Sequence, residues 1–482
     1  MRILQLFLHF ILLGWLFSWL NSILKRLPFF SYLQHKWQSS TPFWKNIVIG
    51  ILFTILFIGL YDSQWIADIE DLNVDWMISL YRGQPPLQDT PPFVILDIDE
   101  TTYRQWQEPV LTPRDKLLQL LDFAVTGQAK LIIIDVVLGT EHDKEQDAKL
   151  QNYLANYESD CKKNSQQKNC PHILLAQGFR LPKNIIPYNP NYIPYFSERS
   201  PSFLDAIVAK APHVHWAATL FDRETDRILR RWQLWTATCT DGKPAIVPSI
   251  SLLSSTLLAD SKYGATRLEK QLTNFKPNCA NPPEILSDNS PIFKLNDSLA
   301  FDLQPSRLSR RILYTIPWRI LDGDKPQKTV NGALLIKRIP AFMALQKNAN
   351  KSLHDKITII GGSFLAGRDW HSTPLGWMPG MYVLANSINS LQQYGVLQPP
   401  PIWKILLFAL ILVIFTSWLL TRFNSFWAML ISIVTFVIIL IPISFWLFKF
   451  GIWLSFAIPL AAIQLRQLAD SFKEPVSCKF VK

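Results

Sequence analysis

The sequence predicts an extracytoplasmic α/β domain with a mainly parallel, mixed sheet, joined to α-helical transmembrane segments at both ends. Two observations predict this fold class. Apolar runs of span length stand near both ends of the chain, and the stretch between them alternates buried strands with amphipathic helices. At 482 residues, with a hydrophobic fraction of 49%, the chain is too long and too apolar for one soluble domain of ordinary size.

Four apolar runs predict membrane helices, at residues 46–61, 403–421, 426–447 and 451–464. A helix over 403–421 would be about 28 Å long, close to the roughly 30 Å hydrocarbon core of a bilayer. A fifth run, residues 3–20, is interrupted by Gln5 and His9 and stays open as a span, an in-plane helix or a signal-like segment. We therefore expect one or two spans before the large domain and three after it.

The placement of charge predicts the topology. The net charge is +11, yet residues 62–402 hold 36 Lys and Arg against 35 Asp and Glu, so the excess flanks the apolar runs. By the positive-inside rule, residues 1–45 are cytoplasmic or membrane-associated and the tail 465–482 is cytoplasmic. Residues 62–402 then lie outside the cytoplasm, in a multi-pass membrane protein. A nucleic-acid binder would carry its excess charge on a folded face, so we expect the lipid bilayer as a partner and no nucleic acid.

The cysteines agree with an oxidising compartment. Four of the five lie in the exported segment, and Cys478 lies in the tail. An even number outside the cytoplasm favours disulfides, although free thiols remain the alternative. Chain proximity favours Cys161–Cys170 and Cys239–Cys279 among the three possible pairings. No C-x-x-C is present, so we expect no structural zinc site.

Residues 91–138 predict a β-α-β unit. Residues 91–98 and 130–138 are continuous, β-branched apolar runs typical of buried strands, with a helix expected over 112–127 between them. Thr112 is the predicted N-cap of that helix, with Pro113 at its first helical position. Because such a connection joins parallel strands, a parallel sheet is expected.

The later part of the domain continues the alternation of strands and helices. Further strands are expected at residues 172–179, 213–220, 228–238, 312–318 and 356–361. Further helices are expected at residues 201–210, 246–259, 339–348 and 380–394. The polar stretches 141–170 and 260–310 are interpreted as loops or insertions.

"ILDIDETT" (95–102) ends the first predicted strand in two aspartates. Asp97 and Asp99 are spaced as the nucleophile and acid/base of a Mg²⁺-dependent, haloacid-dehalogenase-like phosphatase. That reaction also needs a hydroxyl after a second strand, for which Ser363 is a candidate, and a late acidic pair. Asp322 and Asp324 are candidates for the pair but follow no convincing strand. The favoured interpretation is that Asp97 and Asp99 bind a ligand at the carboxyl edge of the sheet, or cap turns and pair with Arg114 or Arg368.

Other polar clusters carry weaker signals. His213 and His215 alternate on one strand like half a metal site, but nothing nearby completes it, so polar surface is the expectation. His371 follows Asp369 without a G-x-S-x-G elbow, so no hydrolase triad is predicted. Trp370, His371 and Trp377 would wall a pocket or pack on the bilayer. Arg227, Arg230 and Arg231 form a basic run interpreted first as a solvated hairpin and second as an anion site. No metal and no cofactor is expected.

Several blocks together resemble the CHASE2 sensor domain, an extracytoplasmic input module of bacterial signalling proteins. These blocks are Asp75 with Arg82, "FVILDIDETT", Trp106 with "TPRDKLLQLL", Asp135, "FDRETDRILRR" (221–231) and "DKITIIGGSFLAGRDWHSTPLGWMPGMYVLANSI" (355–388). One span before the domain and three after it is also the layout of the family. The chain departs from the pattern at "EPVLTPR", at the hairpin turn 223–226 and at Leu384, where the family usually has His.

The resemblance implies a receptor without catalytic activity. The implied ligand contacts are Asp97, Asp99, Arg114, Asp135, Arg368, Asp369 and Asn386. The implied ligand is a small molecule or an envelope component, and the implied protein partners are a second copy of the chain, a membrane signalling protein, or both. Relatives usually continue into a kinase, cyclase or phosphatase, and no such output domain is expected after the last span here. A phosphatase and a structural membrane scaffold are the alternatives.

Overall fold

The computed structural model describes residues 39–448 apart from a set of gaps, and within this range the chain forms two compact units. The gaps are residues 60–63, 83–85, 140, 142, 164–169, 181–197, 223, 241–242, 276–291, 297–299, 304–306, 308, 320–326, 347–352, 398–400, 424, 436–437 and 440. One unit comprises Leu72–Pro399 with Phe445–Trp453, and the other comprises Met1–Asp71, Pro400–Ser444 and Leu454–Lys482.

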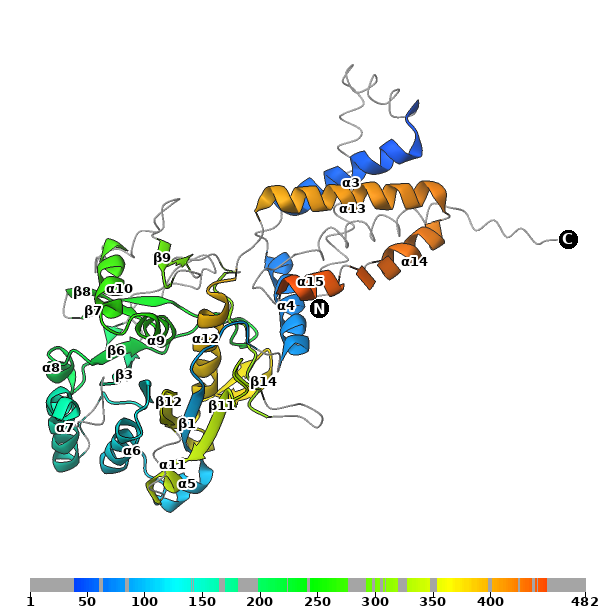
Figure 1. Cartoon of the computed structure of the whole chain (residues 1–482). Coiled ribbons are helices and arrows are strands. Elements are labelled where there is room, and N and C mark those ends of the chain that lie inside the picture. Colours follow the sequence, from blue (N-terminus) through cyan, green and yellow to red (C-terminus); the bar gives the residue numbers. More distant parts are fainter. Residues whose placement is uncertain are drawn as a thin grey trace. The chain divides into compact units, whose positions relative to one another are not determined.

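A six-stranded, wholly parallel sheet forms the centre of the larger unit (Figure 1). Its order is β11-β1-β12-β2-β3-β6, and every pair in it is parallel. The strands are β1 Phe93–Ile98, β2 Leu131–Asp135, β3 His172–Gln177, β6 Val214–Ala218, β11 Ile336–Pro340 and β12 Ile357–Gly362. The predicted parallel sheet is confirmed, and its strands are apolar runs because both faces are covered.

Helices cover both faces of this sheet, and successive side chains of each strand pack against opposite faces. Val94 and Leu96 pack on one side and Phe93 and Ile95 on the other, as a period of two requires. The first side carries α5 Glu100–Gln105, α6 Arg114–Thr126, α7 Lys144–Lys163, α8 Asp205–Val208 and α11 Ala341–Gln346. The second carries α9 Ile250–Ala259, α10 Gly264–Leu272 and α12 Gly380–Tyr394.

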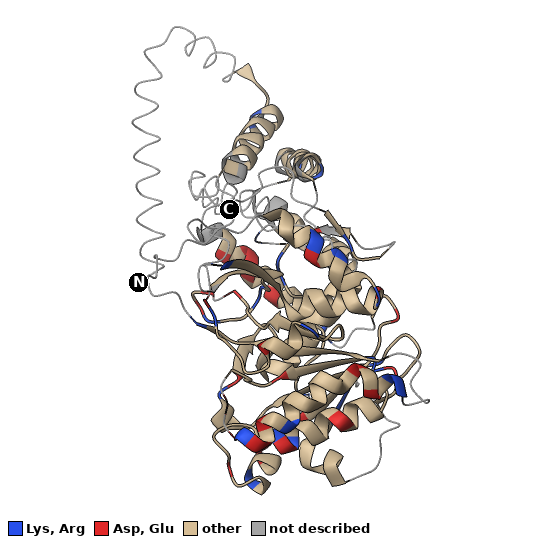
Figure 2. Cartoon of the chain, turned by 90° about the vertical axis from the view of Figure 1, so that its left-hand side faces the viewer, with Lys and Arg blue, Asp and Glu red and all other residues tan. Residues whose placement is uncertain are grey.

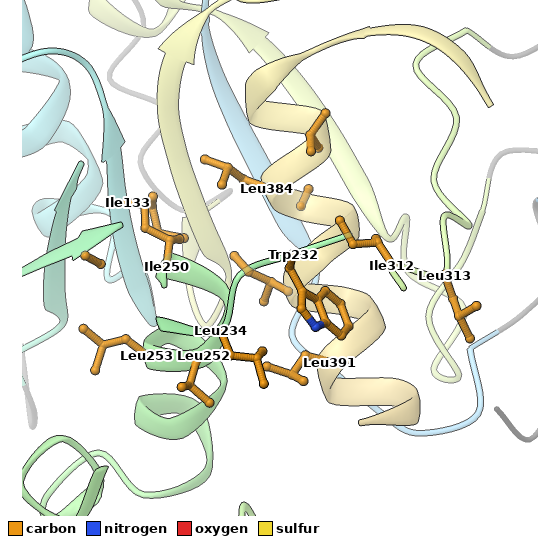
Figure 3. Close-up of a cluster of buried hydrophobic side chains, with 14 of the residues drawn as sticks. Ile133, Trp232, Leu234, Ile250, Leu252, Leu253, Ile312, Leu313, Leu384 and Leu391 are labelled. Atoms are coloured by element: carbon orange, nitrogen blue, oxygen red, sulfur yellow. The ribbon is translucent and has the colours of Figure 1, made fainter. Parts of the chain in front are cut away.

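Two extended segments add to the core on the second face. Residues 228–235 and 311–316 run beside α12 and bring Trp232, Leu234 and Ile312 into the same cluster as Ile133 of β2 and Leu391 of α12 (Figure 3). Trp232 is 1% exposed. Full burial of such a side chain stabilises the fold by roughly 2–3 kcal/mol, so these irregular segments are part of the core rather than surface loops.

Among the described residues, the unit also contains four small antiparallel sheets and the 3₁₀ turns η1 and η3. The paired strands are β4 Phe179–Arg180 with β5 Glu198–Arg199, β7 Trp235–Thr240 with β8 Lys243–Pro248, β9 Ile292–Lys294 with β10 Ala300–Asp302, and β13 Trp370–Thr373 with β14 Gly376–Pro379. The 3₁₀ turns are η1 Thr273–Phe275 and η3 Leu365–Gly367.

Several predictions of secondary structure were wrong. Residues 264–272 form helix α10, although a loop or insertion was expected over 260–310. Of the strand expected at 228–238, only the part from Trp235 lies in a strand, β7, and the first residues of the helix expected at 246–259 belong to strand β8. Residues 144–163 form helix α7 where a loop was expected, because Leu150, Leu154 and Tyr157 make a narrow apolar stripe on an otherwise polar helix. Residues 312–318 form no strand in the structure and instead run extended beside α12. Helix α6 begins at Arg114 with Pro113 at its N-cap, so Thr112 does not cap it. The helix at 380–394 has the predicted bounds.

The disulfide Cys161–Cys170 joins the end of α7 to the approach to β3, with its Cα atoms 5.8 Å apart. This predicted pair is confirmed. Cys239, on β7, is also disulfide-bonded, and its predicted partner Cys279 lies outside the described residues. The cysteine chemistry of this unit therefore fits an oxidising compartment.

The smaller unit contains two helices packed on each other, α3 Pro42–Gly59 and α13 Ile402–Arg422 (Figure 1). Gly50 allows the close approach, since a Cβ there would lie 2.6 Å from a methyl group of Val413. Figure 2 shows few charged residues on these helices, in contrast with the helices of the α/β unit. Among the described residues, no helix meets the length and apolarity needed to cross a bilayer.

The remaining predicted spans are only partly described. Helices α14 Ser425–Thr435 and α15 Ile441–Phe448 occupy the run at 426–447. The runs at 3–20 and 451–464 and the tail 465–482 lie outside the described residues. The membrane layout stays a prediction.

A cluster of three histidines lies at the amino ends of β3 and β6. His172 Nδ1 is 3.0 Å from His215 Nε2, His172 Nε2 is 2.8 Å from the Ser261 carbonyl, and the His213 ring lies 4.8 Å from that of His172. His172 thus lies beside His213 and His215, which were expected to form polar surface and only alternatively half of a metal site. Among the described residues, no group of three or more His, Cys, Asp or Glu is placed to hold a metal ion.

We expect the histidine cluster to weaken the fold in acid. Burial, then the neighbouring His172 and His213, lowers the pKa of His215 to about 4. In the unfolded chain His215 therefore takes up a proton near pH 6.5, whereas in the folded chain it takes one up only near pH 4. The free energy of unfolding falls as the pH drops from 6.5 to 4, and His215 contributes about 3 kcal/mol to this loss.

Urea unfolding at pH 7 and pH 4.5 measures this loss. Asp135 has the opposite effect on stability, because its raised pKa makes the folded chain bind a proton more readily than the unfolded chain as the pH falls. The quantity to compare is therefore the pH dependence of stability in wild type and in His215→Gln. Equal pH dependence in both proteins would contradict the prediction.

Candidate functional site: a pocket at the carboxyl edge of the sheet

A pocket of about 490 Å³ opens at the carboxyl ends of five of the six parallel strands. Ile98, Asp135, Gln177 and Gly362 end β1, β2, β3 and β12, and Thr219 directly follows β6. The rest of the lining comes from residues beside these strand ends and from the segments 103–112 and 364–369. Open α/β sheets bind ligands in this crevice, because the loops after the strands diverge there.

Four aromatic side chains wall the pocket: Tyr103, Trp106, Phe179 and Phe364. The Tyr103 and Phe364 rings stack with centroids 4.3 Å apart and planes 13° apart. Gly362 permits this position of Phe364, because a Cβ there would lie 2.7 Å from the ring. The predicted aromatic wall was therefore placed on the wrong rings. Trp370 instead donates to the Ser363 carbonyl at 3.1 Å, and Trp377 is 67% exposed.

The charged residues of the pocket are Asp135, Asp369 and Arg368, which the sequence predicted as ligand contacts and which the fold brings together. Asp369 Oδ1 lies 2.9 Å from His371 Nε2. Burial, and next the Asp369 carboxylate, raises the pKa of Asp135 to about 7, while His371 opposes the rise. Asp135 therefore titrates near neutral pH in a place where a ligand would alter its charge.

Helix α12 begins beside this carboxylate pair. The Gly380 N–H donates to the Asp369 backbone carbonyl at 2.9 Å, and a Cβ on Gly380 would overlap the Asp369 carboxylate. Glycine at the first position of the helix thus leaves room for Asp369, and the helix dipole favours its negative charge. Helix α12 also packs in the hydrophobic cluster on the second face of the sheet, so it connects the pocket to that cluster.

Arg368 lies at the pocket rim and is exposed. Its backbone is left-handed, with φ 54°, where it ends the 3₁₀ turn η3. Its side chain makes no hydrogen bond or ion pair with the part of the chain that the structure describes. A non-glycine residue in this conformation costs of order 1 kcal/mol, and such strain often accompanies ligand contacts.

Asp97 and Asp99 lie next to each other but do not line the pocket. Asp97 is fully buried, and its Oδ2 accepts from the Arg338 guanidinium and from Ser363 Oγ at 2.9 Å. Arg338 also pairs with Asp99 at 3.2 Å. Asp99 caps α5 by accepting from the Thr102 N–H at 2.8 Å. The turn-capping expectation is confirmed for Asp99, whereas the predicted partners Arg114 and Arg368 were wrong.

Burial raises the pKa of Asp97, and Arg338 is the largest opposing influence. Arg338, on β11, in turn lies 5.1 Å from the Trp318 ring centroid. Asp97 thus links β1 to both of its neighbours, through Arg338 of β11 and through Ser363 directly after β12. No local pattern predicts Arg338 as the partner of Asp97, because the two residues lie 241 positions apart in the chain.

Arg114 and Asn386, also predicted as ligand contacts, hold the framework. Arg114 is 1% exposed, pairs with Asp147 at 3.3 Å and donates to the Val137 carbonyl at 3.4 Å, so it ties α6 and α7 to the loop after β2. Asn386 Oδ1 accepts from the N–H groups of Thr315 and Ile316, both at 2.9 Å. Its Nδ2 donates to the Ile316 carbonyl at 2.8 Å. Asn386 therefore fixes the segment 311–316 to α12.

A second charged cluster is centred on Asp75 of α4 Gln64–Tyr81, and no pattern in the sequence predicted it as a site. Asp75 accepts from Arg230 at 2.8 Å and also pairs with Arg311, whose side chain is fully buried. Arg230 makes two further bonds to Asp226, at 2.8 and 2.7 Å. The basic run at 227–231 is thus neither a solvated hairpin nor an anion site at Arg230 and Arg231, since both are buried and paired with carboxylates.

Removing the Asp369 charge is expected to lower the pKa of Asp135. In Asp369→Asn the amide keeps the shape, but the carboxylate that helps to hold the Asp135 proton is gone, so the pKa falls below 7. Because burial is the larger cause, the pKa stays above its ordinary value. Carboxyl titration by ¹³C NMR measures it, and Asp115→Asn on α6 is the matched control. An unchanged pKa would contradict the pairing.

Comparison with known proteins gives one match. The family model of the CHASE2 domain matches residues 49–423. No curated protein and no solved structure matches the chain.

Proposed function

Because the chain belongs to the CHASE2 family of extracytoplasmic sensor domains, we propose that it is a bacterial inner-membrane receptor that binds a small molecule in the pocket at the carboxyl edge of its sheet. The observation that carries this proposal is the pocket itself, in which the side chains of Asp135 and Arg368 make no hydrogen bond or ion pair with the described residues. The bound state is proposed to pass to partner proteins.

The membrane layout is part of this proposal. Residues 46–61, 403–421, 426–447 and 451–464 cross the bilayer, and residues 62–402 lie in the periplasm. Support comes from the basic residues that flank the apolar runs and from the disulfide Cys161–Cys170.

Thiol labelling of intact cells tests the layout. Tyr263 is 61% exposed on the α/β unit, so Tyr263→Cys is expected to react with a membrane-impermeant maleimide from outside. Wild type supplies the control, because the predicted pairing of Cys239 with Cys279 would leave Cys478, in the proposed cytoplasmic tail, as its remaining free thiol. Labelling of wild type before permeabilisation, or of Tyr263→Cys only after it, would reverse the topology.

Transmission is proposed to run through α4 and Asp75. This helix joins the first apolar run to the α/β unit in sequence, and Asp75 is bonded to Arg230 and Arg311 from the two extended core segments. Ile312 and Leu313, beside Arg311, belong to the core that α12 completes, and α12 begins at Asp369 of the pocket. A change in the pocket thus has a continuous packed route to α4. The partner that receives it is a second copy, another membrane protein, or both.

A ligand screen by thermal shift tests reception. A compound present at 100 times its Kd adds about 2.7 kcal/mol to the folded state, a shift of several degrees. We expect such a shift in the purified full-length protein and its loss in Asp135→Asn, but not in the control Asp160→Asn on the surface of α7. If no compound shifts the wild type, the structural scaffold becomes the better account.

One observation favours the phosphatase alternative enough to test it. Ser363 Oγ lies 2.9 Å from Asp97 Oδ2, as a second phosphatase motif would require. Against it, Asp97 is fully buried beneath Arg338 and does not line the pocket. We expect no hydrolysis of a generic phosphate ester, with or without Mg²⁺. Hydrolysis by wild type that Asp97→Asn abolishes would overturn the receptor assignment.

A further inference from the structure

The charges in the pocket do not balance. Asp135 and Asp369 lie close enough for one carboxylate to raise the pKa of the other. Asp369 has His371 at 2.9 Å and the start of α12 beside it, whereas Asp135 makes no hydrogen bond or ion pair with any described residue. Arg368 faces water at the rim, where solvent screens its charge. The enclosed part of the pocket therefore favours a positive group next to Asp135.

The walls select what carries that positive group. Tyr103, Trp106, Phe179 and Phe364 offer ring faces and edges around the acidic end. Aromatic faces attract cations and pack against apolar bodies, and these attractions strengthen when water is excluded. A strongly hydrated ion without an apolar body would gain little from such walls. A volume of about 490 Å³ suits a molecule with one ring or a short branched chain.

We propose that the ligand is an organic amine, whose ammonium group lies against the Asp135 and Asp369 carboxylates and whose apolar or aromatic body packs on the Tyr103 and Phe364 rings. This inference rests on the proposed function, since it names the class of ligand for the same pocket. The ammonium would complete the carboxylate pair, and the stacked rings would bury the body.

Ammonium binding would depend on pH. The cation favours ionised Asp135, so affinity is full above pH 7 and falls as the pH drops below it. The other titratable or charged groups that face Asp135 are Asp369, His371, Arg368 and Tyr103.

Three isosteric probes test the charge preference: phenethylamine, 2-phenylethanol and phenylacetate. Isothermal titration of the full-length protein in detergent at pH 8 is expected to give a Kd for phenethylamine at least tenfold lower than for the other two. Asp135→Asn should weaken phenethylamine at least tenfold and leave 2-phenylethanol unchanged. Asp160→Asn, at an exposed position, should change neither.

The outcomes separate this inference from the proposed function. A pocket-filling variant, Thr219→Trp, removes binding of any compound that occupies the site. If the alcohol or the acid binds as tightly as the amine, and Thr219→Trp abolishes that binding, the ligand class is wrong and the receptor stands. If no probe binds wild type, the ligand class is overturned, while a library compound lost in Thr219→Trp would still support reception. Binding of phenethylamine that Asp135→Asn leaves intact also overturns the inference.

Discussion

Asp75→Asn is expected to lower the free energy of unfolding of the α/β unit by about 3–5 kcal/mol, because it removes a carboxylate shared by two buried guanidinium groups. The Arg311 side chain is fully buried and that of Arg230 is 6% exposed. The asparagine keeps nearly the same volume, so the loss reports charge rather than packing. Pulse proteolysis of the full-length protein across a urea series measures it.

The control for this loss lies on the same helix. Asp68 of α4 is exposed, and Asp68→Asn is expected to change stability by less than about 0.5 kcal/mol. The double variant Arg230→Met with Asp75→Asn should recover part of the lost stability, because it removes one of the two buried cations together with the carboxylate. If Asp75→Asn and Asp68→Asn unfold at the same urea concentration, the charge network does not hold α4 to the core.

The second large effect is expected at Asn386. Asn386→Leu keeps the volume but removes the acceptor of two buried N–H groups, at Thr315 and Ile316, and the donor to the Ile316 carbonyl. Each buried group left without its bond costs about 1–3 kcal/mol, so a total loss of about 4 kcal/mol is expected. The same urea series measures it.

Asn156→Leu is the matched control, because Asn156 is an exposed residue of α7 bonded only locally. It should stay within about 0.5 kcal/mol of wild type. A near-neutral Asn386→Leu would mean that the segment 311–316 is held by its apolar contacts alone. The proposed route from α12 to Arg311 and α4 would then lose its polar connection.

Local patterns predicted the framework well where both faces of an element are buried. The runs at 91–98 and 130–138 gave parallel strands, since continuous apolar residues suit a sheet covered on both sides. Helix α12 has its predicted bounds because Pro379 precedes it and Gly395, at φ 64°, ends it. Helix α7 was missed because only a narrow stripe of its 20 residues is buried.

The pocket was predicted in part, and the reason is also physical. Asp135, Arg368 and Asp369 follow strands or tight turns, so their place at the carboxyl edge could be inferred from the chain. Arg338, which neutralises Asp97, could not, because its contact joins residues 241 positions apart. Nor could the aromatic walls, since stacking of Tyr103 on Phe364 depends on how two separate loops meet.

Amide hydrogen exchange of the full-length protein in lipid nanodiscs, with and without a saturating compound from the thermal-shift screen, tests transmission from the pocket to α4. Slower exchange is expected in two places at once: at residues 98–112 and 362–369 around the pocket, and in residues 72–81 of α4. Asp75→Asn should keep the first change and lose the second. Two results in wild type would contradict transmission from the pocket to α4: slower exchange only outside these residues, or slower exchange around the pocket with α4 unchanged.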